Sequence, residues 1–150
     1  MIKGVIIKKL NKYEDNRGWL TEVFTRDELE FDPAMGYVSL TNPGIIRGPH
    51  EHVAQSDCFI FLGPGSFQMY LWDRRENSET KGEAMDFEVG IGSPTLVTVP
   101  PGVVHGYKCI SDIPALSINL PDKLYKGEGK KEEIDEIRWE IDPNSPYKIS

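Results

Sequence analysis

The stretch "CFIFLGPGSFQMYLWD", residues 58–73, contains two strand-like segments separated by a turn. The first segment is continuously apolar, which is typical of a buried strand. In the second segment Phe67, Met69 and Leu71 share one face, while polar or amphipathic residues occupy the other. The Gly-Pro-Gly sequence between the segments is a strong turn signal. This pattern predicts two strands of a β-sheet protein.

The same alternation of short strands and turn residues continues in both directions along the chain. Further strands are predicted at residues 4–10, 19–24, 95–99 and 115–120. Helical signal is restricted to residues 25–31 and 130–139, and neither segment has a wide apolar stripe. The fold class is therefore all-β, a sandwich or small barrel. With 39% hydrophobic residues, residues 1–150 are enough for one domain with its own core.

Charge and composition exclude several classes of partner. The chain has 17 Lys and Arg against 24 Asp and Glu, and its basic residues form no stripe, so we expect no nucleic-acid binding. No apolar run approaches the length that spans a bilayer, and the first residues do not resemble a signal peptide. We therefore expect a cytoplasmic protein with no membrane contact. Cys58 and Cys109 are expected to be reduced, buried thiols.

Two of the three histidines lie in "IRGPHEHVAQSD", residues 46–57. Residues two apart on a strand project to the same side, so His50 and His52 are expected to face one way and Glu51 the other. The third histidine, His105, follows the turn "PPGVV". The spacing of the first two histidines and Asp57, together with that of Pro100, Gly102 and His105, resembles the two motifs of the cupin superfamily. The resemblance implies a jelly-roll barrel with every histidine directed into one cavity.

A narrower resemblance covers most of the chain. Five segments in order are similar to the dTDP-4-dehydrorhamnose 3,5-epimerase family and its nucleotide-sugar relatives: "DNRGWLTEVF" (15–24), "PGIIRGPHEH" (43–52), "DRRENSETKG" (73–82), "PPGVVHGYKCISD" (100–112), and Tyr125 with "IRWEIDP" (137–143). This resemblance implies a homodimer without metal or other cofactor. The implied substrate is a 4-keto-6-deoxyhexose on a nucleoside diphosphate, and the implied process is cell-surface polysaccharide biosynthesis.

The implied chemistry matches the residue types. Epimerisation next to a ketone needs a base that works near neutral pH, and histidine has a suitable pKa. By the family pattern His50 is that base, and His105 steadies the substrate or its enolate by hydrogen bonding. Arg47 occupies the place of an arginine that binds the diphosphate, for which a planar guanidinium is well suited.

Further residues match the family's binding positions. Arg17, Leu20 and Glu22 correspond to positions that hold the nucleotide, in part from the neighbouring subunit. Gln55 and Tyr125 are expected on the substrate side of the cavity. His52 joins His50 and His105 as a catalytic candidate.

The chain departs from the family pattern at three places. Counting forward from His105, the family's acid tyrosine falls on Ile118 or Asn119. Where a lysine normally follows the glutamine by two residues, Gln55 is followed by Asp57, whose charge would oppose an enolate. The C-terminal aspartate that partners the family's base is also missing, and Asp57 or Glu51 is the expected substitute.

Three other functions remain open. The motif "RGPHEH" also resembles nucleotide-sugar 3,4-ketoisomerases, in which His50 and His52 would shuttle a proton, with Tyr37 as a third member and Tyr107 or Tyr125 as substitute acids. A metal-dependent cupin would bind one divalent transition metal. Its ligands would be His50, His52, Asp57 and His105. A non-catalytic binder of a nucleotide sugar is the third alternative.

Overall fold

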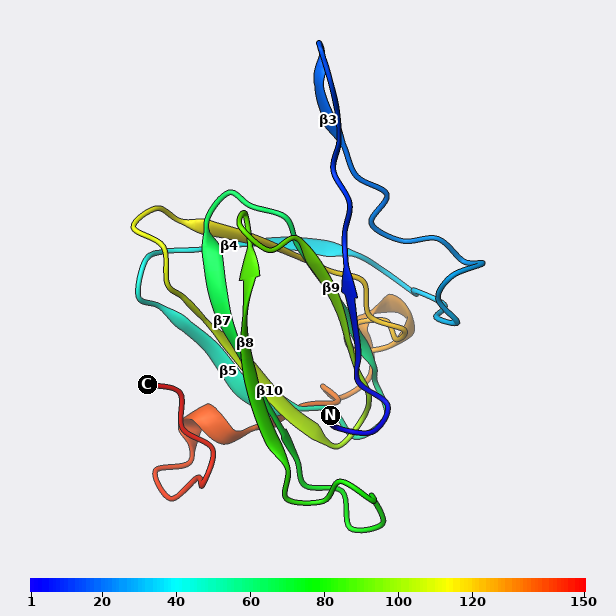
Figure 1. Cartoon of the computed structure of the whole chain (residues 1–150). Coiled ribbons are helices and arrows are strands. Elements are labelled where there is room, and N and C mark those ends of the chain that lie inside the picture. Colours follow the sequence, from blue (N-terminus) through cyan, green and yellow to red (C-terminus); the bar gives the residue numbers. More distant parts are fainter.

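Two antiparallel five-stranded sheets face each other in the computed structural model, which describes all 150 residues (Figure 1). The first sheet contains, in spatial order, β1 (Ile6–Lys9), β9 (Thr95–Val99), β6 (Asp57–Phe61), β11 (Ala115–Asn119) and β4 (Tyr37–Thr41). The second contains β12 (Ile137–Arg138), β5 (Ile46–Glu51), β10 (Val103–Cys109), β7 (Ser66–Asp73) and β8 (Ala84–Gly90). The chain has no α-helix. The predicted all-β jelly roll is confirmed.

The Gly-Pro-Gly turn carries the chain from one sheet to the other. Strand β6 belongs to the first sheet and β7 to the second, so these consecutive strands do not pair. Gly65 has a φ of 71°, and a Cβ added there would lie 2.6 Å from the Cβ of Ala115. The close approach of the two sheets at this corner therefore requires glycine.

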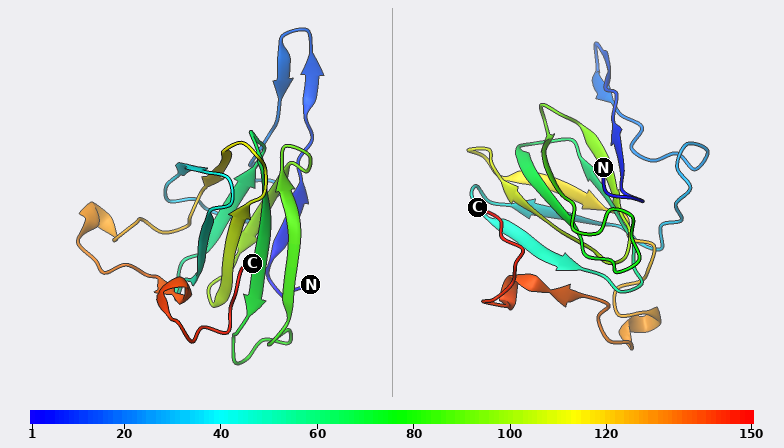
Figure 2. Two further views of the ribbon diagram at one scale, coloured as in Figure 1. Left: turned by 90° about the vertical axis from the view of Figure 1, so that its left-hand side faces the viewer. Right: turned by 60° about the horizontal axis from the view of Figure 1, so that its bottom comes forward.

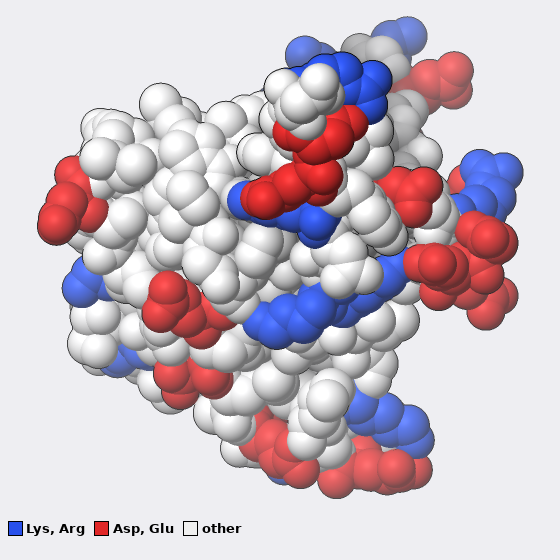
Figure 3. Space-filling model, turned by 45° about the horizontal axis from the view of Figure 1, so that its top comes forward, with Lys and Arg blue, Asp and Glu red and all other residues white.

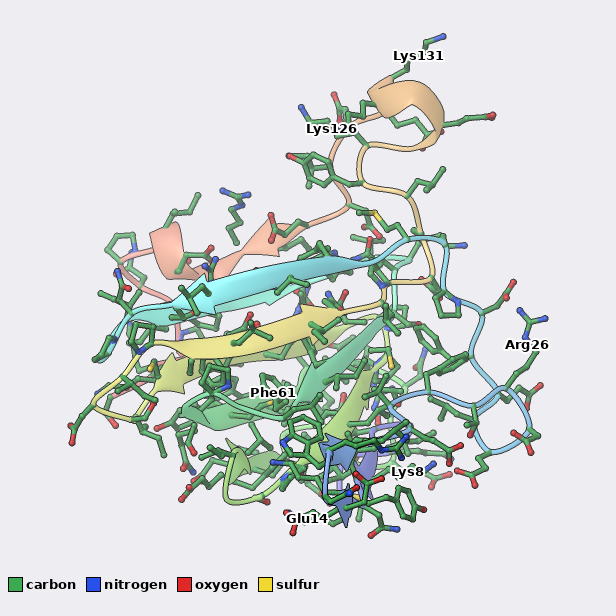
Figure 4. The ribbon with its side chains drawn as sticks, turned by 90° about the horizontal axis from the view of Figure 1, so that it is seen from above. Lys8, Glu14, Arg26, Phe61, Lys126 and Lys131 are labelled. Carbon is green, nitrogen blue, oxygen red and sulfur yellow. The ribbon has the colours of Figure 1, made fainter.

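The core lies between the sheets. Phe67, Met69 and Leu71 are fully buried, which confirms the predicted inward face of β7. Phe61, between the sheets in Figure 4, packs edge-to-face on Tyr107 with ring centroids 5.5 Å apart. Each large side chain buried in this way contributes roughly 1.5–3 kcal/mol. The aromatic cluster fixes the separation of the sheets next to the histidines.

Several predicted boundaries differ from the observed ones. The strand predicted at 19–24 is confined to β3 (Gly18–Leu20), which pairs with β2 (Tyr13–Asp15). Residues 25–31 form a turn and no helix. The helix predicted at 130–139 is also wrong. This charged stretch has no apolar stripe to bury, and its Ile137 and Arg138 instead pair with β5.

Two segments extend from the barrel. The β2–β3 hairpin stands clear of it in both views of Figure 2, and the C-terminal tail runs along its lower side. The tail includes the single-turn helices η1 (Glu128–Lys130) and η2 (Trp139–Ile141), and Figure 4 shows Lys126 and Lys131 on its projecting loop. Cys58 and Cys109 are buried and unpaired, as expected. Neither short helix of the tail has the length or the apolar character of a membrane-spanning helix.

Candidate active site

A β-bulge in β5 places Arg47 and His50 on the same side of the strand. Against β10, Arg47 pairs with Tyr107 and His50 pairs with His105, so two residues of β5 lie opposite one residue of β10. Residues three apart on a regular strand point to opposite faces, and the extra residue reverses this relation. Both side chains therefore line one cavity.

Gly48 and Pro49 form the bulge. Gly48 has a φ of 81°, and a Cβ there would lie 2.7 Å from the His105 carbonyl oxygen and 3.1 Å from Nδ1 of His50. Only glycine fits this backbone conformation and this spacing. The "RGPH" sequence therefore specifies the geometry that aligns the arginine with the first histidine.

The cavity has a volume of about 1170 Å³ and lies between the ends of β4 and β5 and the tail. This volume suits a ligand larger than a free hexose. Its lining includes His50 and His52 but not His105, which is buried directly behind them. The expectation that all three histidines line the cavity is therefore correct for two of them.

The three histidines surround Asp57, which is 1% exposed and is the first residue of β6. Its Oδ2 lies 3.2 Å from Nε2 of His52 and 3.1 Å from Nε2 of His105. The His50 and His105 rings make an edge-to-face contact, with centroids 4.5 Å apart. The structure thus brings His105 next to three residues that lie about fifty positions earlier in the sequence, His50, His52 and Asp57.

Backbone carbonyls fix the orientation of two of these rings. Nδ1 of His52 donates to the carbonyl of Asp135, and Nδ1 of His105 donates to the carbonyl of Val103 at 3.0 Å. Each Nε2 is therefore directed at Asp57. In His52, a proton on Nε2 makes the ring cationic. Burial lowers the pKa of His52, but its contacts with Asp57 outweigh burial and raise the pKa to about 9. His52 is thus charged at neutral pH and compensates the buried carboxylate.

His50 has the opposite electrostatic character. Burial, together with the neighbouring His105 and His52, holds the pKa of His50 well below its ordinary value of 6.5. At neutral pH its ring is therefore uncharged and able to accept a proton. Its Nδ1 lies 3.8 Å from Oε1 of Glu136, whose other oxygen accepts a 2.6 Å hydrogen bond from Arg138.

The tail attaches to the histidine segment through Asp135. The carboxylate of Asp135 accepts hydrogen bonds of 2.8–2.9 Å from the backbone N–H groups of Val53, Ala54 and Gln55. Strand β12 then continues along β5, with Arg138 opposite His50. These contacts hold Glu136 beside the ring of His50.

Comparison with known proteins identifies the family. A family model described as dTDP-4-dehydrorhamnose 3,5-epimerase matches residues 1–143. The chain belongs to this family. It is 39% identical over 135 residues to a probable low-salt glycan biosynthesis epimerase of Haloferax volcanii, covering 88% of this chain and 86% of that protein. It is 35% identical over 142 residues to a spore coat polysaccharide biosynthesis protein of Bacillus subtilis, covering 93% and 91%.

The fold of the family is shared as well. The solved structure of a dTDP sugar isomerase from Desulfovibrio desulfuricans superposes with a TM-score of 0.83 at 23% identity, covering 98% of this chain and 91% of that one. Among the binding residues expected from the family pattern, Arg47, Gln55 and Tyr125 line the cavity. Arg17 and Leu20 lie on the projecting hairpin and Glu22 just beyond it, and none of the three lines the cavity of its own chain.

The position of Arg47 fits anion binding. Its Nε donates to Thr41 Oγ1 at 2.7 Å and its Nη2 to the Leu40 carbonyl at 3.0 Å. These bonds fix the plane of the guanidinium and leave its remaining N–H groups for the cavity. A preoriented guanidinium binds phosphate oxygens at a lower entropic cost.

Two expectations about carboxylates need correction. Glu51 does not orient His50, because it points to the other face of β5 and pairs with Arg74 and with the indole N–H of Trp139. Asp57 does not present an uncompensated charge to the cavity, since it is buried between histidines. The carboxylate nearest the His50 ring nitrogens is Glu136. Glu136 lies within a charged tail segment, and no sequence pattern indicated that it would approach His50.

Proposed function

We propose that this protein is a nucleotide-sugar epimerase that acts on a 4-keto-6-deoxyhexose linked to a nucleoside diphosphate. The observation that carries the proposal is a neutral histidine, His50, aligned with Arg47 on one bulged strand at a large cavity. The proposed setting is glycan biosynthesis, in line with the names of both curated relatives.

In the proposed reaction His50 removes the proton from a carbon next to the ketone. The electron pair of the broken C–H bond moves toward the ketone, which becomes an enolate. Glu136 stabilises the imidazolium that forms on His50, because its carboxylate is close to Nδ1. The positive charge on His52 offsets Asp57, so the enolate does not meet an unpaired negative charge.

The environment of His52 favours epimerisation over a 3,4-ketoisomerase reaction. A shuttle along one face of the sugar requires a second histidine with a free lone pair. His52 has one nitrogen occupied by the Asp135 carbonyl and the other facing Asp57, and it remains protonated to about pH 9. It therefore acts as a fixed charge in the proposed mechanism, and His50 is the base.

The pH dependence of kcat/KM follows from these two histidines. Because the pKa of His50 is well below 6.5, we expect no loss of activity at pH 6.5 and a decline only in more acidic solution. Because the pKa of His52 is about 9, activity should fall as the pH rises through that value and Asp57 loses its compensating charge. Initial rates measured from below pH 6.5 to above pH 9 test the prediction. A profile that rises through pH 6.5, typical of an unperturbed histidine base, would contradict it.

The nucleotide is proposed to bind between two subunits. Arg17 is 85% exposed on the hairpin and pairs with Asp15, far from the cavity of its own chain. Val38 and Leu40 on β4 are 62% and 58% exposed, and the surface on the left of Figure 3 carries few charged side chains. An apolar sheet face and a projecting hairpin suit a homodimer in which each hairpin reaches the partner's cavity.

Replacing Arg17 with alanine tests this arrangement. We expect Arg17→Ala to weaken dTDP binding on the order of tenfold, the loss of about one charge-assisted hydrogen bond, while leaving the melting temperature unchanged. Calorimetric titration with dTDP measures the affinity. Arg26→Ala is the matched control, because Arg26 is also a highly exposed arginine paired with an aspartate, Asp32. Equal affinity in wild type and Arg17→Ala would refute the role of the hairpin.

A metal-dependent reaction is the second candidate. The ligand atoms of His50, His52, Asp57 and His105 lie within 4.8 Å of one another. Asp57 Oδ2 and His105 Nε2 are buried without a well-aligned hydrogen bond. The second ring nitrogens of His52 and His105 are held by carbonyls, as in many metal sites. This donor set suits a divalent first-row cation.

Product analysis distinguishes an epimerase from a ketoisomerase and from a non-catalytic binding protein. The protein is incubated with dTDP-4-keto-6-deoxyglucose, and the resulting keto sugars are identified directly by NMR without reduction. Sugars inverted at C3, C5 or both support the epimerase. A 3-keto product supports the ketoisomerase, and an unchanged sugar with measurable affinity supports a binding protein.

A further inference from the structure

We propose that the hydroxyl of Tyr37 donates the proton that completes the epimerisation, from the side of the cavity opposite His50. This inference rests on the proposed epimerase function and assigns its second catalytic group. The family pattern places its acid at Ile118 or Asn119 of β11, and Tyr37 is paired with Asn119 on the neighbouring strand. A phenol is thus present at the expected place, supplied by β4 instead of β11.

Asn119 fixes the direction of the Tyr37 hydroxyl. The amide oxygen of Asn119 accepts a 3.1 Å hydrogen bond from the backbone N–H of Cys58, so its NH₂ group must point the other way. This NH₂ group donates to Asp57 Oδ1 and to the Tyr37 oxygen, both at 2.9 Å. The phenol oxygen therefore acts as an acceptor toward Asn119, and its own O–H is free to donate into the cavity.

The two proposed catalytic groups lie on facing sheets. Tyr37 is on β4 of the first sheet, His50 is on β5 of the second, and both line the cavity. A sugar ring held between them would present one face to each. Inversion at carbon requires this arrangement, because the proton must leave from one face and return to the other.

The protonation state of Tyr37 suits a donor. Burial of its hydroxyl raises the pKa, the hydrogen bond from Asn119 acts in the opposite sense, and the nearby charge of Asp57 raises it further, to about 12. The phenol is therefore neutral over the pH range in which His50 is an effective base. Its 45% exposed side chain is accessible from the cavity.

The proton balance is complete with these two groups. His50 takes the proton from the carbon, and the C–H electron pair forms the enolate. The Tyr37 O–H bond then breaks as its proton adds to the opposite face of that carbon, and the enolate returns to the ketone. The resulting phenolate regains a proton from water, and the imidazolium of His50 releases one to water.

The variant Tyr37→Phe removes only the hydroxyl. It therefore separates proton removal by His50 from proton donation to the opposite face by Tyr37. In deuterated buffer with dTDP-4-keto-6-deoxyglucose, we expect its epimer formation to fall on the order of 10²-fold or more. Deuterium exchange into the recovered substrate should continue, because His50 still removes and returns the proton on its own face. Proton NMR follows both processes in one sample. Tyr70→Phe is the matched control, since Tyr70 lies on β7 away from the cavity lining.

Each outcome of this experiment is informative. Epimer formation by Tyr37→Phe within a few-fold of wild type would overturn the proposal. If Tyr37→Phe loses both deuterium exchange and epimer formation, the proposal is also overturned, because the hydroxyl would then serve binding or folding. If wild type itself shows neither process, the proposed function fails, and the role of Tyr37 fails with it.

Discussion

His50→Ala is expected to abolish epimer formation and deuterium exchange together. His50 is the neutral ring at the cavity, and without it no base lies next to the substrate carbon. General-base catalysis contributes about 10²–10⁴-fold, so a rate reduction of at least 10²-fold is expected. The side chain of His50 is 17% exposed and borders the cavity, so its removal enlarges that cavity and should leave the jelly roll folded. Kinetics and thermal melting of the same preparation measure both effects.

His50→Gln is the companion variant, because it preserves a polar side chain of similar size without a basic nitrogen. Both variants should lose exchange while retaining affinity for dTDP, since Arg47 remains in place on β5. Normal turnover by either variant would end the assignment of His50 as the base. Loss of dTDP binding would show instead that the substitution damages the cavity.

Asp57→Asn is expected to have the largest effect on stability. It removes the charge that lies 3.1–3.2 Å from two histidine nitrogens in the protein interior. Removing one partner of a buried ion pair costs about 3 kcal/mol or more, which lowers the melting temperature of a domain of this size by on the order of 10 °C. Asp112→Asn is the control, because Asp112 is an exposed aspartate in the bend that follows β10. A melting temperature equal to that of wild type would contradict the account of the cluster.

The stability difference should also depend on pH. The folded-state pKa of His52 is about 9, above its ordinary value of 6.5. The Asp57–His52 contact therefore stabilises the fold fully below pH 6.5, and this contribution is lost as the pH rises through about 9. Asp57→Asn lacks the contact. The difference in unfolding free energy between wild type and variant should thus become smaller as the pH rises from 6.5 to about 9. Denaturant titrations at several pH values measure this difference.

Local sequence patterns predicted the strands, whereas the histidine cluster was implied by the cupin resemblance. The alternation of Phe67, Met69 and Leu71 identified the inward face of β7. Such features depend on residues close in sequence. The family resemblance added the order of the motifs, which periodicity alone does not contain.

Other features depend on pairing between distant strands. The crossing from β6 to β7 at Gly65 follows from packing against Ala115, and the bulge at Gly48 follows from pairing with β10. Glu136 reaches His50 because the tail adds a strand to the edge of β5. Tyr37 approaches Asn119 through the β4–β11 register. No local periodicity encodes these long-range contacts, so the sequence did not reveal them.

The most direct test of the central claim is deuterium incorporation by the wild-type protein. The protein is treated with a chelator, its metal content is verified by elemental mass spectrometry, and it is incubated with dTDP-4-keto-6-deoxyglucose in deuterated buffer. If His50 is the base, we expect the proton NMR signal at C3 or C5 to disappear as fast with the metal-free protein as with the untreated protein. Absence of exchange would contradict His50 as the base. Exchange that appears only after a divalent metal is restored would also contradict it and would support the histidines and Asp57 as metal ligands.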